Sequence, residues 1–185
     1  YFGDGATSQG DIHESMNYAS IHQLPVVFIC ENNRYAISVP LSHQMVIDQV
    51  TVRATGYRMP GVTVDGTDLL AVYEATAKAA KLASSGGGPS LIEFNVERSL
   101  PHTSDDDDSV YRSREEIQES RARDPLLRLQ ELLLRFGIIK KDQDEEYRVC
   151  AKREVDEATE IAEAAPYPTV DGFFKQVYGD VEGDR

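Results

Sequence analysis

Residues 1–5 read Tyr-Phe-Gly-Asp-Gly, and residues 31–33, further along the chain, read Glu-Asn-Asn. The apolar pair at the start predicts the end of a buried strand, and the glycines that flank Asp4 predict a turn. Glycine permits backbone angles and a close ligand approach that a side chain forbids. The carboxylate of Asp4 is therefore expected on a bare turn at the carboxyl end of a strand.

The paired amides at positions 32 and 33 follow a second apolar segment. Residues 26–30 read Val-Val-Phe-Ile-Cys, a run typical of a parallel strand that is covered on both faces. Between the two strands, Ser8 and Asp11 have the form of a capping box and predict a helix from about Ser8 to His22. The free amides at its start favour an anion such as phosphate. In an open α/β sheet, ligands bind in the crevice where such loops meet.

These two loops together predict a magnesium site against a diphosphate. Mg²⁺ prefers oxygen ligands, usually a carboxylate, amide or backbone carbonyl oxygens, and phosphate. The Asp4 carboxylate, the Asn33 side chain and the carbonyl of Tyr35 are able to supply the protein share. Taken alone, each motif is more often an ordinary turn or loop. The intervening order of strand, helix and strand favours the site.

The rest of the chain continues the alternation of strands and helices, then becomes helical. The expected elements are a helix from Ser42 to Val52 or Arg53, a strand at 62–64, a helix capped by Thr67 or Asp68, a strand at 90–96, a helix from Pro125 and a helix over 143–165. The fold class is α/β, a mostly parallel sheet with flanking helices. We predict a cofactor-binding core at 1–112 and a helical C-terminal region at 113–185.

Composition excludes several functions. With 19 basic and 32 acidic residues among 185, the net charge of −13 argues against nucleic-acid binding. No run has membrane-spanning length, so no membrane partner is expected. Two cysteines cannot form a disulfide framework. The expected location is cytoplasmic, or the mitochondrial matrix in a eukaryote.

These motifs resemble a known family. The pattern Gly-Asp-Gly to Asn-Asn matches the thiamine diphosphate fingerprint. Residues 1–11 and 31–38 resemble the alpha subunit of the decarboxylating component of 2-oxo acid dehydrogenase complexes. Residues 98–112, Arg-Ser-Leu-Pro-His-Thr-Ser-Asp-Asp-Asp-Asp-Ser-Val-Tyr-Arg, look like that subunit's active-site loop, and residues 64–73 like the strand and helix before it. The resemblance extends to about residue 140.

The resemblance implies thiamine diphosphate and Mg²⁺ as cofactors and assigns roles to individual residues. Asp4, the Asn33 side chain and the Tyr35 carbonyl would bind Mg²⁺. Gly5 and Ala6 would contact the diphosphate through backbone amides. The fold implied is the diphosphate-binding domain of thiamine diphosphate enzymes.

His102 aligns with the family's active-site histidine, which contacts the cofactor and serves acid-base chemistry or stabilises the intermediate. The run Asp105–Asp108 lacks the spacing of a calcium loop, so we expect it to be solvated and mobile. Thr103 stands where related enzymes carry a regulatory phosphoserine. The chain departs from the family pattern at Glu97, where tyrosine is common, and at Glu31, where some branched-chain members have a phosphate-binding arginine.

The resemblance implies a subunit that decarboxylates a 2-oxo acid and passes the acyl group to a lipoyl-bearing acyltransferase. A beta subunit would complete the site in an assembly of two alpha and two beta subunits, and a further segment is expected ahead of residue 1. The motifs resemble the branched-chain (2-oxoisovalerate) type more than the pyruvate type. The alternatives are a pyruvate or acetoin dehydrogenase subunit, a non-catalytic fragment, or another phosphate-binding α/β domain, for example for a nucleotide.

Overall fold

The computed structural model describes residues 1–170 of the chain. The chain forms two compact units, one spanning Tyr1–Arg135 and a second that begins at Phe136. The domain division expected at residue 112 stays a prediction, and residues 171–185 of the expected C-terminal region lie outside the described residues.

The first unit is built on a parallel sheet with strand order β1-β2-β6-β5. The strands are β1 (Phe2–Gly3), β2 (Val27–Asn32), β6 (Ser90–Asn95) and β5 (Gly61–Asp65), and each neighbouring pair runs parallel. The α/β fold class with a mostly parallel sheet is therefore confirmed. All carboxyl ends of these strands meet at one edge, which is the edge where Asp4 and Asn33 follow their strands.

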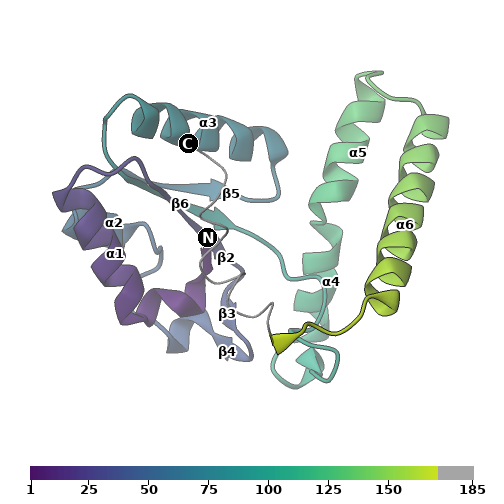
Figure 1. Ribbon diagram of the computed structural model, residues 1–185, viewed down its shortest axis with the longest axis horizontal. Helices are drawn as coiled ribbons and strands as arrows, with labels where there is room; N and C mark the ends of the chain where they lie inside the picture. The colour runs from purple at the N-terminus through teal and green to yellow at the C-terminus, as the bar shows by residue number, and fades with distance from the viewer. Residues whose placement is uncertain (171–185) are drawn as a thin grey trace. The chain divides into compact units, whose positions relative to one another are not determined.

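Helices cover both faces of this sheet (Figure 1). The helices α1 (Gly10–Ile21) and α2 (Val52–Gly56) lie on one face, and α3 (Leu69–Ser84) lies on the other. Side chains alternate along β2, so Cys30 packs toward α1 while Ile29 packs toward α3. Burial raises the pKa of the Cys30 thiol to about 12, which leaves this cysteine protonated and unreactive at neutral pH.

The long helix of the α3 face begins where the sequence predicts. Asp68 is its N-cap, and the Oδ1 atom accepts hydrogen bonds from the backbone amides of Leu70 at 3.0 Å and Ala71 at 3.2 Å. These contacts satisfy amides that have no partner within the helix. The helix expected from Pro125 is also present, as α5 (Pro125–Arg135), and follows α4 (Arg114–Ala122).

The prediction of a helix from Ser42 to Val52 or Arg53 is wrong. The expected range instead opens in a 3₁₀ turn, η2 (Leu41–His43), which follows the antiparallel pair of β3 (Tyr35–Ala36) and β4 (Val39–Pro40). Beyond this turn, regular helix resumes only at α2. This region is rich in β-branched residues, which form helices poorly, and its side chains make tertiary contacts that outweigh local helix propensity.

The second unit contains one long helix in its described part, α6 (Lys141–Ala164), close to the range expected from the sequence. Ion pairs one turn apart run along it, including Lys152 with Asp156 at 2.6 Å and Arg148 with Asp144 at 3.1 Å. Such pairs support a solvated helix surface. Within residues 1–170, no helix combines the length and apolar character that a bilayer crossing requires.

Candidate metal and cofactor site

Asp4 occupies the first position after β1. It begins a 3₁₀ turn, η1 (Asp4–Ser8), so that α1 begins at Gly10 rather than near Ser8 as expected. The Thr7 hydroxyl donates to the Asp4 carbonyl at 2.7 Å and closes this turn. Asp4 is only 1% exposed and belongs to none of the ion pairs within the described part of the chain, an unusual position for a carboxylate. The glycine-flanked turn therefore buries this carboxylate instead of presenting it to bulk solvent.

The loop that carries Asn33 lies against Asp4. In the parallel register of β1 and β2, Phe2 is opposite Cys30 and Gly3 is opposite Glu31. The turns that follow the two strands therefore begin next to each other at the same edge of the sheet. The backbone of Asn33 lies near enough to the Asp4 carboxylate to lower the pKa of that group. The two loops, distant in sequence, are thus brought together as the sequence predicts.

Side-chain hydrogen bonds set the path of this second loop. The Asn32 Oδ1 atom accepts from the amide of Arg34 at 2.9 Å, and the Asn33 Oδ1 atom accepts from the amide of Tyr35 at 3.0 Å. Arg34 has a φ of 69°, which places it in the left-handed region. These successive turns direct the chain into β3, where Tyr35 begins.

Gly5 lies close to β3 in the turn η1. A Cβ atom built on Gly5 would lie 2.5 Å from Cβ of Ala36 and 3.3 Å from its Cα. No side chain fits there without separating the two segments. Gly5 and Ala6 therefore form a turn whose backbone lies directly against the loop that carries the other expected ligands.

Gln44 is a further group of this site, which sequence reasoning missed. Its Nε2 atom donates to Asp4 Oδ2 at 3.2 Å and to the carbonyl of Val39 at 2.8 Å. Both partners are acceptors, which fixes the orientation of the amide. The Oε1 atom is buried and has no hydrogen-bond partner within residues 1–170. No local pattern signals this role, because it depends on the irregular path that replaces the expected helix.

The electrostatics of Asp4 fit a cation neighbour. Burial raises the pKa of the Asp4 carboxyl above its usual value, and hydrogen bonds from Gln44 and from backbone amides only partly offset that effect. Among residues 1–170, no group of three or more His, Cys, Asp and Glu side chains converges as a metal site. The oxygens here are instead a carboxylate, an amide and backbone carbonyls, a set that suits Mg²⁺ completed by phosphate and water.

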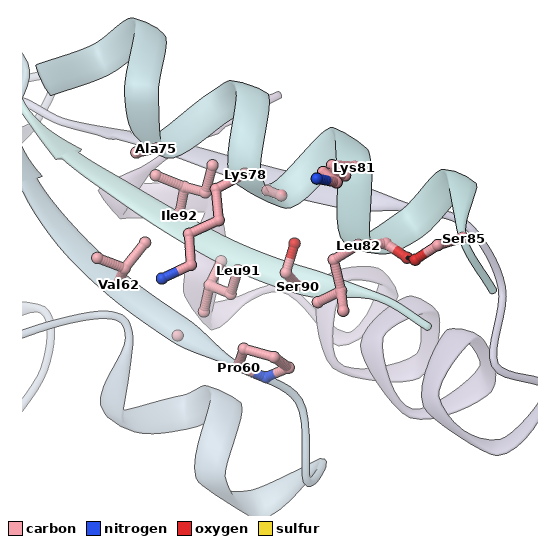
Figure 2. A pocket seen from close by; sticks show the side chains of 12 residues that line it. Pro60, Val62, Ala75, Lys78, Lys81, Leu82, Ser85, Ser90, Leu91 and Ile92 are labelled. Carbon is pink, nitrogen blue, oxygen red and sulfur yellow. Dashed lines mark hydrogen bonds between the residues drawn. The ribbon is translucent and has the colours of Figure 1, made fainter. Parts of the chain in front are cut away.

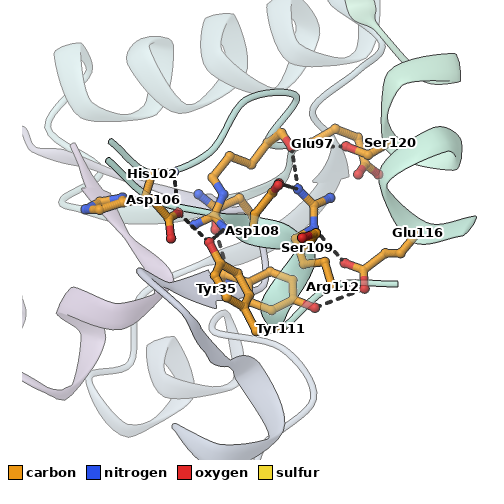
Figure 3. Close-up of polar contacts among 12 residues, drawn as sticks. Tyr35, Glu97, His102, Asp106, Asp108, Ser109, Tyr111, Arg112, Glu116 and Ser120 are labelled. Carbon is orange, nitrogen blue, oxygen red and sulfur yellow. Dashed lines mark hydrogen bonds and ion pairs between the residues drawn. The ribbon is translucent and has the colours of Figure 1, made fainter. Parts of the chain in front are cut away.

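His102 lies on a different segment, the loop between β6 and α4. Its side chain is exposed, and its backbone amide donates to Asp106 Oδ2 at 2.8 Å. Figure 3 shows the imidazole ring directed away from the polar cluster formed by Tyr35 and Arg112. The structure does not connect His102 to Asp4 through any contact, so its catalytic role stays a prediction.

The aspartate run 105–108 is not the freely solvated segment that we expected. Asp106 accepts from the Tyr111 hydroxyl at 2.6 Å, and Asp107 caps the short helix η3 (Asp108–Val110) by accepting from the Ser109 amide at 3.1 Å. Asp108 accepts from Arg112 Nη1 at 3.1 Å. Three of the carboxylates thus shape the loop, because nearby donors compete successfully with water.

Two arginines fasten this loop to the hairpin that carries Tyr35 (Figure 3). Arg98 donates to the carbonyl of Ile37 at 2.7 Å and to the Tyr111 hydroxyl at 2.7 Å. Its guanidinium carbon lies 5.4 Å from the centre of the Tyr35 ring, and that of Arg112 lies 5.6 Å from it. These contacts hold the loop of His102 against the loop of Asn33. The arginine and tyrosine residues that make them are scattered in the sequence, so no motif predicts this association.

Comparison with known proteins decides the family. A family model described as "Dehydrogenase E1 component" matches residues 1–171. The chain belongs to this family. Membership implies thiamine diphosphate as the cofactor, in agreement with the fingerprint at the two loops.

The curated relatives of this dehydrogenase E1 chain are alpha subunits. The chain is 47% identical over 177 residues to the 2-oxoisovalerate dehydrogenase subunit alpha of Bacillus subtilis (strain 168), covering 96% of this chain and 54% of the relative. It is 40% identical over 181 residues to the 3-methyl-2-oxobutanoate dehydrogenase subunit alpha of Mycobacterium tuberculosis (strain ATCC 25618 / H37Rv), covering 98% and 49%. It is 40% identical over 182 residues to the pyruvate dehydrogenase E1 component subunit alpha of Mycoplasma pneumoniae (strain ATCC 29342 / M129 / Subtype 1), covering 98% and 51%. The chain spans about half the length of these relatives.

The two departures from the family pattern have different surroundings in this dehydrogenase E1 chain. The Glu97 side chain is 6% exposed and pairs with Arg34 at 2.9 Å and Arg123 at 3.1 Å. This glutamate therefore connects the Asn33 loop with the end of α4, and the two arginine cations offset the cost of burying its charge. Glu31 is exposed and lines a shallow pocket on the α3 face of the sheet.

An apolar groove of about 640 Å³ lies elsewhere in this E1 chain, at the amino ends of β5 and β6 (Figure 2). Pro60, Val62, Lys78, Leu82 and Leu91 are among the residues that line it. Asp4 and Asn33 follow the opposite, carboxyl ends of their strands. The groove therefore lies at the other end of the strands from the expected chemistry and contains none of the residues expected to bind cofactor.

Proposed function

We propose that the chain is the diphosphate-binding part of the alpha subunit of a 2-oxo acid dehydrogenase that uses thiamine diphosphate and Mg²⁺. Family membership supports the enzyme class. The single structural observation that carries the proposal is the contact of the Asp4–Gly5 turn with the Asn33–Ala36 loop. This contact brings the expected carboxylate and amide ligands to the same edge of the sheet.

In the proposed site, the Asp4 carboxylate, the Asn33 side-chain oxygen and the Tyr35 carbonyl bind Mg²⁺. Asn33 Oδ1 already accepts from the Tyr35 amide, and an amide oxygen has a second lone pair for a cation. Gln44 donates to Asp4 Oδ2 and thereby orients the carboxylate. Its unpartnered Oε1 atom suits a hydrogen bond from water on the cation.

Gly5 and Ala6 contribute backbone rather than side chains. The absence of a side chain at Gly5 keeps η1 against β3, and the amides of both residues would bind the diphosphate. When bound, the cofactor supplies the electron sink for decarboxylation. His102 would hold or deliver a proton near the reacting carbon, which requires its exposed loop to fold over the bound substrate.

A branched-chain 2-oxo acid such as 2-oxoisovalerate is the proposed substrate. The relative of Bacillus subtilis, 2-oxoisovalerate dehydrogenase subunit alpha, is 47% identical to this chain. The second candidate is pyruvate, because a pyruvate dehydrogenase subunit alpha shares 40% identity over nearly the same length. Acetoin is less well supported, since the corresponding subunit of Bacillus subtilis shares 38%.

The word alpha in the names of the relatives supports a second kind of subunit as a partner. We propose a beta subunit that completes the site in an assembly of two alpha and two beta subunits. The acyl group would pass to a lipoyl-bearing acyltransferase. A cytoplasmic location, or the mitochondrial matrix in a eukaryote, is part of the same proposal.

Calorimetric titration of the full-length protein with thiamine diphosphate tests the binding proposal. We expect heat only when Mg²⁺ is present, with and without the beta subunit as separate arms. Absence of heat in both arms would reject cofactor binding and favour the non-catalytic alternative. Heat from NAD or ATP in a parallel titration would favour a nucleotide-binding domain instead.

The substrate is tested by comparing kcat/KM of the reconstituted alpha and beta subunits on 2-oxoisovalerate and on pyruvate, with an artificial electron acceptor. We expect 2-oxoisovalerate to be preferred by at least about tenfold, because one or two methylene groups in an apolar pocket contribute roughly 10–200-fold. A preference for pyruvate would reject the branched-chain assignment and leave the cofactor site untouched.

A further inference from the structure

Glu93 is a buried acidic residue to which neither the motifs nor the proposed chemistry assigns a role. It lies in the middle of β6 and is 0% exposed. Its Oε1 atom accepts from Asn32 Nδ2 at 2.7 Å, and its Oε2 atom accepts from the Thr51 amide at 3.2 Å and the Thr63 hydroxyl at 3.0 Å. Among the ion pairs of residues 1–170, none includes Glu93.

A buried carboxyl group held only by neutral donors is an expensive way to fill a core position. The neighbouring positions on the same strand, Ile92 and Phe94, are apolar and pack in the core. A hydrophobic side chain at position 93 would avoid the cost of removing a polar group from water. The hydrogen bonds that Glu93 makes therefore point to a requirement for orientation rather than for stability alone.

The oxygen that contacts Asn32 leads directly to the candidate metal loop. Asn32 is 2% exposed, and its amide is held at both ends: Nδ2 donates to Glu93, while Oδ1 accepts from the Arg34 amide at 2.9 Å. Asn33 lies between these two contacts, and its own Oδ1 accepts from the Tyr35 amide. The hydrogen bonds between Glu93 and Asn32 and between Asn32 and the Arg34 amide form a clamp, and the direction in which Asn33 leaves β2 depends on it.

We propose that Glu93 is a positioning residue for the cation site: through Asn32 it sets the turn that presents Asn33 and the Tyr35 carbonyl to Mg²⁺. This inference rests on the proposed function for its consequence in cofactor binding. Its geometric part, the control of the loop by Glu93, concerns the protein without any ligand. The contacts of Oε2 with Thr51 and Thr63 belong to the packing of α2 and β5 and offer a separate, purely structural link.

An exchange of the two side chains tests the clamp. In Glu93→Gln, two donors oppose each other in either orientation of the new amide: its nitrogen meets Asn32 Nδ2 or, if the amide turns over, the Thr51 backbone amide. In Asn32→Asp, two carboxylates oppose each other. In the double variant Glu93→Gln/Asn32→Asp, the Gln amide donates to the Asp carboxylate, so the bond is restored with its direction reversed and the formal charge unchanged. Each single variant should therefore fail where the double variant succeeds.

The first readout needs no ligand. Hydrogen exchange of the Arg34 and Tyr35 amides in the full-length protein reports whether the two turns remain closed. We expect exchange at both amides to be at least about tenfold faster in each single variant and to return to within about threefold of the wild-type rate in the double variant. The second readout is the affinity for Mn²⁺ with thiamine diphosphate, which should fall by about 10–100-fold in the single variants, as for other residues that orient metal ligands, and recover in the double variant.

Thr63→Val is the matched control, because it removes a donor to Glu93 Oε2 and leaves the Asn32 contact in place. It should lower the melting temperature without changing exchange at the Arg34 and Tyr35 amides. If a single variant does not fold, Glu93→Ala removes the acceptor of Asn32 Nδ2, leaves Asn32 Oδ1 in place and should accelerate exchange at the same amides. Wild-type exchange in the single variants, or failure of the double variant to restore it, would overturn the inference. If exchange behaves as expected but the wild-type protein shows no Mn²⁺-dependent cofactor binding, the proposed function fails and the geometric part stands.

Discussion

Replacing Gly5 by alanine should separate the two halves of the candidate site. The new Cβ would lie 2.5 Å from Cβ of Ala36 and 3.3 Å from its Cα. Carbon atoms in contact lie at about 3.5–4.0 Å, so η1 and β3 must move apart by about 1 Å. Metal-ligand distances tolerate changes of about 0.2 Å, so Asp4 and the Tyr35 carbonyl should no longer bind the same ion.

The expected magnitudes follow from this displacement. Overpacking of this kind costs about 1–3 kcal/mol, which corresponds to a fall in melting temperature of roughly 2–12 °C for a protein of this size. Affinity for thiamine diphosphate with Mg²⁺ should fall by about 100-fold, the usual effect of misplacing a functional group by 1 Å. Calorimetric titration and thermal denaturation of the full-length protein measure the two effects separately.

Gly3→Ala is the control for this experiment. Its Cβ would approach nothing closer than the Glu31 carbonyl at 3.9 Å, and its φ of −85° suits any residue. Melting temperature and cofactor affinity should therefore stay near those of the wild type. A Gly5→Ala protein that melts earlier but binds cofactor and Mg²⁺ with wild-type affinity would refute the reasoning, because the two loops would then not form a shared site.

Three further predictions concern the carboxylates and the loop of His102. In Asp4→Asn, the protein without metal should melt at or above the wild-type temperature at pH 7, because burial raises the pKa of Asp4 and makes its charged form costly. Saturating Mg²⁺ and cofactor should stabilise the wild type by about 2.7 kcal/mol at 100-fold excess over Kd, and thermal denaturation of the variant should show no such stabilisation. In Tyr111→Phe, loss of the hydrogen bonds to Asp106 and from Arg98 should make limited proteolysis of residues 98–112 about tenfold faster, and unchanged cleavage would show that the Tyr111 hydroxyl does not order the loop. Burial alone would raise the pKa of Asp65, but hydrogen bonds from Thr67 and Arg128 hold that pKa at about 2. The stability that ionised Asp65 contributes is therefore complete above about pH 4 and is lost as the pH falls toward 2. The difference in melting temperature between wild type and Asp65→Asn should shrink over that interval, and a constant difference would contradict the assignment.

The main architecture and the meeting of the two loops were predictable from local patterns. Apolar runs such as 26–30 identify buried parallel strands, and turns at the carboxyl ends of neighbouring strands must meet at one edge. The position of Asp4 beside the Asn33 loop follows from this geometry. The cap at Asp68 was predictable for the same reason, since capping depends on residues that are adjacent in sequence.

The parts that sequence reasoning missed depend on contacts between distant residues. Gln44 reaches Asp4 because residues 42–51 do not form the expected helix, and the hydrophobic periodicity of the sequence does not predict that irregular conformation. Glu93 reads as an interruption in an apolar strand until Asn32 is found beside it. The sequence predicts a solvated run at 105–108 because the donors to these aspartates, Tyr111 and Arg112, approach them only in the folded loop.

The most direct test of the central claim is a crystal structure of the full-length protein with thiamine diphosphate and Mn²⁺, in which anomalous scattering locates the ion. The account predicts one ion within about 2.0–2.3 Å of an Asp4 carboxylate oxygen, the Asn33 side-chain oxygen and the Tyr35 carbonyl, with diphosphate oxygens completing the coordination. An ion bound to the diphosphate but more than about 4 Å from both Asp4 and Asn33 would contradict it.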